Sequence, residues 1–234
     1  MTRWHSFGAS VIGPSHLVDG KPNQDAWLAF YNACGDGIVV SDGLGSKQRS
    51  DYGSRAACLA VARAADASPV PPQDADEGLF DRIKDNWLSL IVPLAPSECS
   101  ATCVFALRLG NGFVRMAMLG DGLAAAVKKD GSVVSLYDDK SEGFSNITSA
   151  ITPNTSAADW RDVSLVEEEC IAVLLCTDGV ADDLVDRDGF VKGLVETHRG
   201  LATVTADRHI REMLASWPTP KHSDDKTIAC LYRE

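Results

Sequence analysis

The sequence contains no long hydrophobic run and no secretion signal. No stretch approaches the roughly 20 consecutive apolar residues needed to cross a bilayer, and the first residues, Met-Thr-Arg-Trp-His-Ser, lack the apolar core of a signal peptide. A CxxC pair is also missing, and the seven cysteines are odd in number, several of them inside apolar runs. We therefore expect core thiols in a reducing compartment, no zinc site, and a cytoplasmic protein without membrane contact.

Basic residues are scarce, since 22 Lys and Arg stand against 33 Asp and Glu and the formal net charge is −11. A charge of this sign repels phosphate backbones and anionic lipid surfaces, so it argues against nucleic acid and membranes as partners. It suits a site that collects divalent cations, although an acidic surface alone more often serves solubility. With 45% hydrophobic residues, the chain has enough apolar side chains for a folded core.

Hydrophobic periodicity divides the chain into strands and helices. Short apolar or alternating runs bounded by Gly, Pro and Asn predict strands at residues 4–12, 26–31, 38–41, 101–109, 113–119, 123–128, 133–137, 171–177 and 226–232. Apolar residues three and four apart predict helices at residues 50–67, 79–90, 190–196 and 204–217. Glycine-containing turns between the four strands from 101 to 137 predict antiparallel hairpins. No repeat or linker interrupts the pattern, so we expect one domain, 1–234, of mixed α and antiparallel β structure with a polar loop at 138–159.

Asp-Gly occurs seven times, and its context separates turns from candidate ligands. Asp-Gly commonly makes tight turns, and we assign the pairs at positions 19, 36, 130 and 188 to turns because their surroundings are polar or hairpin-like. Asp42, Asp121 and Asp178 instead each end an apolar run that is typical of a central strand. Rigid strand ends can hold carboxylates around an ion, and unpaired, partly desolvated carboxylates are costly. These three aspartates therefore predict a cation site.

The ligands indicate which cation the site would hold. Carboxylates without an accompanying His or Cys pattern suit Mg²⁺ or Mn²⁺, and glycine after Asp42 allows close approach, so the Gly43 carbonyl is a further candidate ligand. Two other acidic segments join the candidates: Asp25 at the start of a strand, and Asp224 with Asp225 before the last strand. Either segment alone is more simply explained by N-cap or turn chemistry.

The order of five motifs along the chain is more specific than any one of them. They are Asn-Gln-Asp-Ala at 23–26, Ser-Asp-Gly-Leu-Gly-Ser at 41–46, Leu-Gly-Asp-Gly at 119–122, Cys-Thr-Asp-Gly-Val-Ala-Asp at 176–182 and Asp-Asp-Lys-Thr at 224–227. In this order, over nearly the whole chain, they resemble the protein phosphatase 2C family of metal-dependent Ser/Thr phosphatases, and in particular its compact bacterial branch. The resemblance implies an α+β fold, a four-layer αββα sandwich of two antiparallel sheets flanked by helices.

The resemblance also implies a reaction and the residues that carry it. Phosphoserine and phosphothreonine in proteins would be hydrolysed by a hydroxide that bridges two Mn²⁺ or Mg²⁺ ions, with no side-chain nucleophile. Asp25, Asp42 and Asp178 would be catalytic, with Asp42 bridging the ions and Asp25 holding metal-bound water. The two main ions would be bound by Asp42, Gly43, Asp178 and Asp224. A third, weaker ion would be bound by Asp121, Asp178 and Asp182. The partner would be a phosphorylated protein, such as a cognate Ser/Thr kinase or its targets.

The chain departs from the family pattern near its first motif. Gly20 stands where many members carry a phosphate-binding Arg, so His16 or Lys21 would have to bind the substrate phosphate instead. Gln24 stands where other members have Glu, which weakens the coordination of one ion and favours a contact through water.

These departures keep two alternatives open. A phosphatase-fold protein that has lost activity and only binds phosphorylated partners is suggested by Gly20 and Gln24, although all the strand-end aspartates are present. A Mg²⁺-binding adhesion module of the von Willebrand A type is suggested by the apolar strand that ends at Asp178. Such modules need Asp-x-Ser-x-Ser, and the segment that starts at Asp42 lacks the middle Ser.

Overall fold

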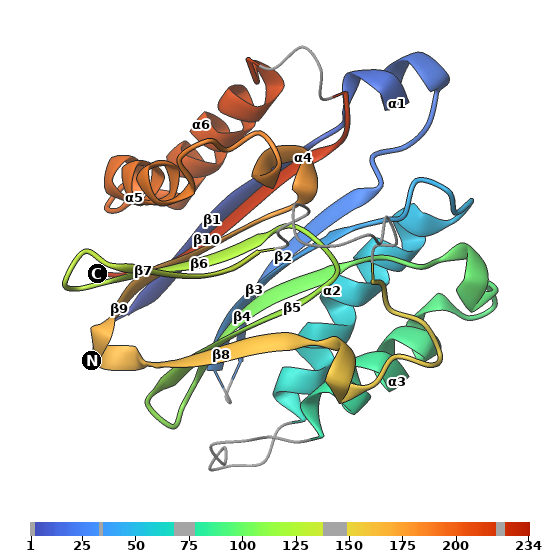
Figure 1. The fold of residues 1–234 in the computed structure, drawn as a ribbon, viewed down its shortest axis with the longest axis horizontal. Coiled ribbons are helices and arrows are strands. Elements are labelled where there is room, and N and C mark those ends of the chain that lie inside the picture. Colours follow the sequence, from blue (N-terminus) through green and yellow to red (C-terminus); the bar gives the residue numbers. More distant parts are fainter. Residues whose placement is uncertain (1–2, 33–34, 68–77, 138–148, 219–222) are drawn as a thin grey trace.

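A computed structural model describes residues 3–32, 35–67, 78–137, 149–218 and 223–234. Two five-stranded sheets pack face to face, and helices cover both outer surfaces (Figure 1). Every strand pair within the sheets is antiparallel. The four-layer αββα sandwich expected from the family resemblance is therefore confirmed.

The first sheet has the strand order β1-β10-β9-β6-β7. Its strands are β1 (Trp4–Val11), β6 (Leu123–Lys128), β7 (Val133–Tyr137), β9 (Cys170–Cys176) and β10 (Lys226–Arg233). The second sheet has the order β2-β3-β4-β5-β8. Its strands are β2 (Asp25–Asn32), β3 (Gly35–Asp42), β4 (Cys103–Leu109), β5 (Phe113–Leu119) and β8 (Arg161–Val166).

The longer helices form the two outer layers. On the second sheet lie α2 (Ser50–Asp66) and α3 (Leu79–Ile91), and on the first lie α5 (Arg187–His198) and α6 (Thr203–Ala215) (Figure 1). Two short helices follow strand ends: α1 (Pro14–Asp19) after β1 and α4 (Asp178–Ala181) after β9. Three single turns of 3₁₀ helix complete the described part, at Pro96–Glu98, Ala157–Asp159 and Glu167–Glu169. No helix in the described ranges is both long and apolar enough to cross a membrane.

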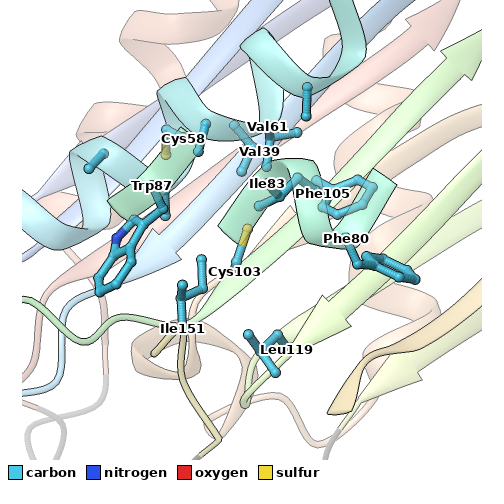
Figure 2. Close-up of a cluster of buried hydrophobic side chains, with 14 of the residues drawn as sticks. Val39, Cys58, Val61, Phe80, Ile83, Trp87, Cys103, Phe105, Leu119 and Ile151 are labelled. Carbon is cyan, nitrogen blue, oxygen red and sulfur yellow. The ribbon is translucent and has the colours of Figure 1, made fainter. Parts of the chain in front are cut away.

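The apolar residues form three buried clusters, one between the two sheets and one under each helical layer. Figure 2 shows the cluster under α2 and α3, where Ile83 and Trp87 of α3 lie with Val39 of β3 and Phe105 of β4. The Ala-rich face of α2 allows this close packing. At Gly53 there is no room for a side chain, because a Cβ there would lie 1.6 Å from the carbonyl oxygen of Cys99.

Most predicted elements are present with end shifts of a few residues, and three were missed: α1, α4 and β8. The helix α1 was missed because six residues are too short for helical periodicity to show. Strand β8 was missed because it is a partly exposed edge strand, so its sequence Arg-Asp-Val-Ser-Leu-Val is only partly apolar. Of the predicted polar loop at 138–159, residues 138–148 lie outside the described residues, and the final three form a 3₁₀ turn.

The hairpin prediction was wrong at one turn. Strands β4 and β5 pair, as do β6 and β7, but β5 and β6 belong to different sheets. Gly120 and Gly122 have φ values of +97° and +115°, which only glycine adopts easily, and they carry the chain from one sheet to the other. Asp121 therefore lies at the junction of the two sheets.

Two of the four Asp-Gly turn assignments were also wrong. Asp36 lies inside β3, where an ion pair of 3.5 Å with Arg108 of the neighbouring strand satisfies its charge. Asp188 lies in the first turn of α5, where a carboxylate is favourable beside the helix N-terminus. Asp130 does occupy the β6–β7 turn, and its carboxylate accepts bonds from Ser132.

Candidate metal centre

Asp25 and Asp42 face each other across the β2–β3 pair, at the start of one strand and the end of the other. The Gly43 amide continues the pairing by donating to the Gln24 carbonyl at 3.1 Å. The Asp42 amide donates to the Thr102 hydroxyl at 2.9 Å, and the Thr102 amide donates to the Asp42 carbonyl at 2.8 Å. Asp42 and Gly43 are thus held rigidly at the end of the second sheet.

Asp25 is buried and connects the two sheets. The hydroxyls of Thr177 and Thr227 each donate to its Oδ2 atom at 2.7 Å. Thr177 follows β9 and Thr227 lies in β10, so both donors come from the first sheet, whereas Asp25 comes from the second. Because Thr177 directly precedes Asp178, these bonds bring Asp178 to the same end of the sandwich.

The carboxyl groups of this region repel one another. Burial raises the pKa of Asp25 to about 7 against the opposing effect of the two threonine hydroxyls. The pKa of Asp42 is raised well above its usual range, first by burial and then by the charges of Asp25, Asp178 and Asp224. Four of the predicted site residues therefore converge on one region, as expected from their positions at strand ends.

Asp225 was predicted only as a neighbour of Asp224, yet it has the more extensive hydrogen bonds. Its carboxylate is buried and accepts from the Gly13 amide at 2.6 Å, the Gln24 amide at 2.6 Å and His16 Nδ1 at 2.9 Å. The Asp224 side chain is exposed, and its Oδ1 accepts from the Asp225 amide at 2.9 Å. Asp225 therefore fixes the loop between β1 and β2, and Asp224 remains available as a ligand.

A cavity of about 300 Å³ lies over this end of the sheets. Its lining residues are Ser15, His16, Gln24, Asp42, Gly43, Gly45, Ser223 and Asp224. His16 is buried on α1, and its ring lies within 4.8 Å of ligand atoms of Asp224 and Asp225. Lys21, the other predicted phosphate ligand, does not line the cavity, and its ammonium group lies 3.6 Å from Asp19 Oδ2 on the surface.

Asp121 and Asp182 lie near the end of β9. Asp121 is buried in the turn between the sheets, where a Cβ on the next residue, Gly122, would lie 2.7 Å from the carbonyl oxygen of Cys176. Asp182 is exposed at the end of α4, one turn after Asp178. The pKa of the Cys176 thiol is raised mainly by burial and then by the charges of Asp178 and Asp182, so these two carboxylates flank the same strand end.

A larger cavity of about 1050 Å³ lies at the opposite end of the sandwich, near the start of β1, and contains none of the predicted site residues. Arg108, which lines it, lies between Asp36 and Glu167, at 3.5 and 3.0 Å. Arg108 is thus paired within the protein, whereas Asp42 at the other end is surrounded by the like charges of Asp25, Asp178 and Asp224. We therefore place the candidate site at the Asp42 end.

The Asp42 end fits a divalent cation. Carboxylate and carbonyl oxygens are the donors that Mg²⁺ and Mn²⁺ prefer, and among the described residues no cysteine lines the cavity. Burial and then the neighbouring carboxylates raise the pKa of Asp42, and a bound cation would offset both effects.

Comparison with known proteins agrees with this geometry. A family model described as protein phosphatase 2C matches residues 12–215. A bacterial serine phosphatase is 17% identical, with 99% of this chain and 98% of that chain covered and a TM-score of 0.72. The catalytic domain of the serine threonine protein phosphatase PstP, in complex with two manganese ions, is 16% identical, with 100% and 99% covered and a TM-score of 0.70.

The serine/threonine phosphatase Stp1 from Staphylococcus aureus is 17% identical, with 100% of this chain and 96% of that chain covered and a TM-score of 0.70. At these identities the solved structures establish the shared fold, and no curated protein sequence matches significantly. The family model covers well over half of the sequence. The chain therefore belongs to the protein phosphatase 2C family.

Proposed function

We propose that the carboxylate centre at the Asp42 end hydrolyses phosphoserine and phosphothreonine in proteins with the help of divalent metal ions. Membership of the protein phosphatase 2C family supports a metal-dependent serine/threonine protein phosphatase over the binding-only and adhesion alternatives. The observation that carries the proposal is the raised pKa of Asp42 among the charges of Asp25, Asp178 and Asp224. Such a group of like charges is stable as anions only when a cation neutralises it.

The proposed ligands come from both sheets. Asp42 and the Gly43 carbonyl lie at the end of β3, Asp178 follows β9 and Asp224 precedes β10. These four groups would hold two Mn²⁺ or Mg²⁺ ions, with Asp42 shared between the ions. Asp121 and Asp182, together with Asp178, would hold a third, weaker ion. This assignment is supported by the positions of Asp121 and Asp182 beside the end of β9.

The ions, when bound, supply a water of lowered pKa and positive charge that offsets the charge of the phosphate. Asp25 accepts hydrogen bonds from two threonines at Oδ2, and its carboxyl group is also hydrogen-bonded to that of Asp42. These bonds fix the orientation of Asp25, which would hold a water in the site. The chain therefore needs no side-chain nucleophile.

His16 is the better candidate for the substrate phosphate than Lys21. His16 lines the cavity, and its Nδ1 is held by the Asp225 carboxylate, which can only accept a hydrogen bond. The remaining ring nitrogen, Nε2, is left for the phosphate. Lys21 lies outside the lining and pairs with Asp19.

The partner of a protein phosphatase is a phosphorylated protein, and we propose a cognate Ser/Thr kinase or its targets.

We also propose that residues 1–234 act as one catalytic domain, because the apolar cluster between the sheets contains residues of both sheets and the proposed site draws ligands from both sheets. Six cysteines of the described part are buried and unpaired, which supports a reducing, cytoplasmic location.

The test is hydrolysis of a small aryl phosphate and of a phosphothreonine peptide, with and without Mn²⁺. We expect Mn²⁺-dependent turnover that falls by roughly 1000-fold or more in Asp42→Asn and Asp178→Asn, because bound ions contribute several kcal/mol of charge stabilisation. Asp130→Asn, which changes an Asp-Gly pair in an exposed hairpin turn, is the matched control and should keep full activity.

Metal-independent turnover, or full activity in both site variants, would contradict the mechanism. A wild-type protein that binds the phosphopeptide but never hydrolyses it would favour the binding-only alternative instead.

A further inference from the structure

Ser10 of β1 lies directly opposite Thr227 of β10 in the strand register. The hydroxyl oxygens of these two residues are 2.8 Å apart. The Thr227 oxygen also lies 2.7 Å from Asp25 Oδ2, to which this hydroxyl donates one of the two threonine bonds. Both Thr227 and Asp25 are buried. The Ser10 side chain is therefore only one hydroxyl group away from a carboxylate of the candidate metal centre.

Asn23 connects the same serine to the backbone of Asp25. The Asn23 Nδ2 group donates to the Ser10 hydroxyl oxygen at 2.8 Å, and the Asp25 amide donates to Asn23 Oδ1 at 3.0 Å. Through Asn23, Ser10 and Thr227, four hydrogen bonds thus form a closed ring that begins at the Asp25 amide and ends on the Asp25 carboxylate. The ring joins β1, β10 and the segment that enters β2.

The available protons determine the direction of each bond in this ring. The Asp25 amide can only donate, so it faces the side-chain oxygen of Asn23 and leaves the Asn23 NH₂ group to donate to Ser10. Each hydroxyl has a single proton to donate. An ionised Asp25 can only accept, so the Thr227 proton is directed at Asp25 and the Ser10 proton at Thr227. The bonds from Asn23 onward therefore run in series toward Asp25 Oδ2.

This series gives Ser10 a defined role. Its oxygen accepts from Asn23 while its proton polarises the Thr227 hydroxyl, and buried hydrogen bonds in series strengthen one another. We propose that Ser10 is a positioning residue for the reaction, which acts through Thr227 to hold the Asp25 carboxylate in its orientation. This inference rests on the proposed function, in which Asp25 holds a water in the site.

The experiment measures kcat and KM for a small aryl phosphate at saturating Mn²⁺ in Ser10→Ala, Thr227→Val and the double variant. We expect the kcat of Ser10→Ala to fall about tenfold, as is typical when an outer hydrogen-bond partner at a metal site is removed. Its KM should be unchanged, because Ser10 does not line the cavity. Thr227→Val removes the direct bond to Asp25 and should lower kcat further. Because Ser10 acts through Thr227, the double variant should have the kcat of Thr227→Val alone.

Ser6→Ala is the matched control. Ser6 lies on the same strand, and its hydroxyl is 2.7 Å from the Tyr31 hydroxyl of β2. Both of these residues line the cavity at the opposite end of the sandwich. This variant also removes one serine hydroxyl that bonds to another hydroxyl, yet it should keep the wild-type kcat and KM.

Hydrogen exchange at the Asp25 amide provides a readout that does not depend on catalysis. This amide bonds to Asn23 Oδ1, and the Asn23 side chain is in turn held by Ser10. In the metal-free protein, Ser10→Ala should release Asn23 and make exchange at Asp25 about tenfold faster, of the order of one lost hydrogen bond. Ser6→Ala should leave this exchange rate unchanged.

Three kinetic results would overturn the positioning role: a wild-type kcat in Ser10→Ala, an equal fall of kcat in Ser6→Ala, or a kcat in the double variant well below that of Thr227→Val. If the wild type hydrolyses no aryl phosphate with Mn²⁺, the proposed function fails separately. The exchange rates then decide whether Ser10 orients Asp25, because faster exchange in Ser10→Ala alone supports this role and exchange at the wild-type rate rejects it.

Discussion

Asp42 ends β3 with its carboxyl group close to the charges of Asp25, Asp178 and Asp224. The backbone bonds with Thr102 prevent the strand end from moving away from these charges. In the metal-free protein the repulsion is a cost to the folded state, because the unfolded chain separates the same groups in water. A residue placed to bind a cation is thus expected to destabilise the protein when the cation is absent.

Asp42→Asn removes one of these charges and should therefore stabilise the metal-free protein. We expect the free energy of unfolding in urea with a chelator at pH 7.5 to rise, because a neutral amide avoids both the burial cost and the repulsion that raise the pKa of Asp42. Asp130→Asn should leave it nearly unchanged, because that side chain is in an exposed turn. A metal-free Asp42→Asn protein that is less stable than the wild type would show that the carboxyl group contributes to the fold in another way.

At the scale of elements, the sequence predicts the periodic segments well and the connections poorly. Strands such as β3 and β9 contain continuous apolar runs, so these runs and the carboxylates that follow them could be predicted. The helix α1 is too short to show periodicity, and the turn at Gly120–Gly122 resembles an ordinary hairpin although it joins the two sheets. Local sequence does not determine which sheet the next strand enters.

The same limit applies to the side chains around the ligands. Asp224 and Asp225 are adjacent in sequence, but the chain bends at Asp224 just before β10, and one side chain is exposed while the other is buried. The family resemblance named Asp224, which lines the cavity, whereas the residue types alone do not distinguish the two. Thr177 and Thr227 lie inside the recognised motifs, yet their bonds to Asp25 depend on the packing of the two sheets.

Asp225 is expected to determine the order of α1. Asp225→Asn retains one acceptor oxygen where the carboxylate offers two, so at least one of the bonds from Gly13, Gln24 and His16 is lost. We expect the free energy of unfolding to fall by about 3 kcal/mol, since bonds to a buried charged group are strong, and hydrogen exchange at the Leu17 and Lys21 amides to become faster.

Ser15→Ala is the control for this change. It removes a single exposed bond, from the Ser15 hydroxyl to the Ser223 carbonyl, and should cost no more than about 1 kcal/mol. Equal exchange rates at α1 in Asp225→Asn and the wild type would show that other contacts fix the helix.

At the scale of the whole molecule, the site joins the two sheets. Asp25 and Asp42 belong to the second sheet, whereas Asp178 and Asp224 adjoin strands of the first. The sheets share one apolar cluster along their length, and at this end they meet through carboxylates of like charge and the threonine hydroxyls bound to Asp25. Binding of cations here acts on the packing of both sheets, so the stability of the molecule should depend jointly on pH and metal.

The direction of that dependence follows from the raised pKa values. The pKa of Asp25 is about 7 in the folded protein against an ordinary value of 3.8 for the unfolded chain, so between these pH values the folded protein holds a proton that the unfolded chain has lost. The metal-free protein should therefore lose stability as pH rises from about 4 to 7, by on the order of 4 kcal/mol from this group alone. Below about pH 4 both states are protonated and this loss is absent.

Divalent cations should reverse the loss at high pH. At pH 7.5 the carboxyl groups release their protons to the solvent when a cation binds, whereas at pH 5.5 protons compete for the same oxygens. We therefore expect 5 mM Mn²⁺ or Mg²⁺ to raise the melting temperature more at pH 7.5 than at pH 5.5, and Asp42→Asn to remove most of that difference. Differential scanning calorimetry with a chelator or with the metal measures both effects. A metal-induced shift that is equal at the two pH values would mean that the cation binds away from the groups with raised pKa values, and the ligand assignment would then be wrong.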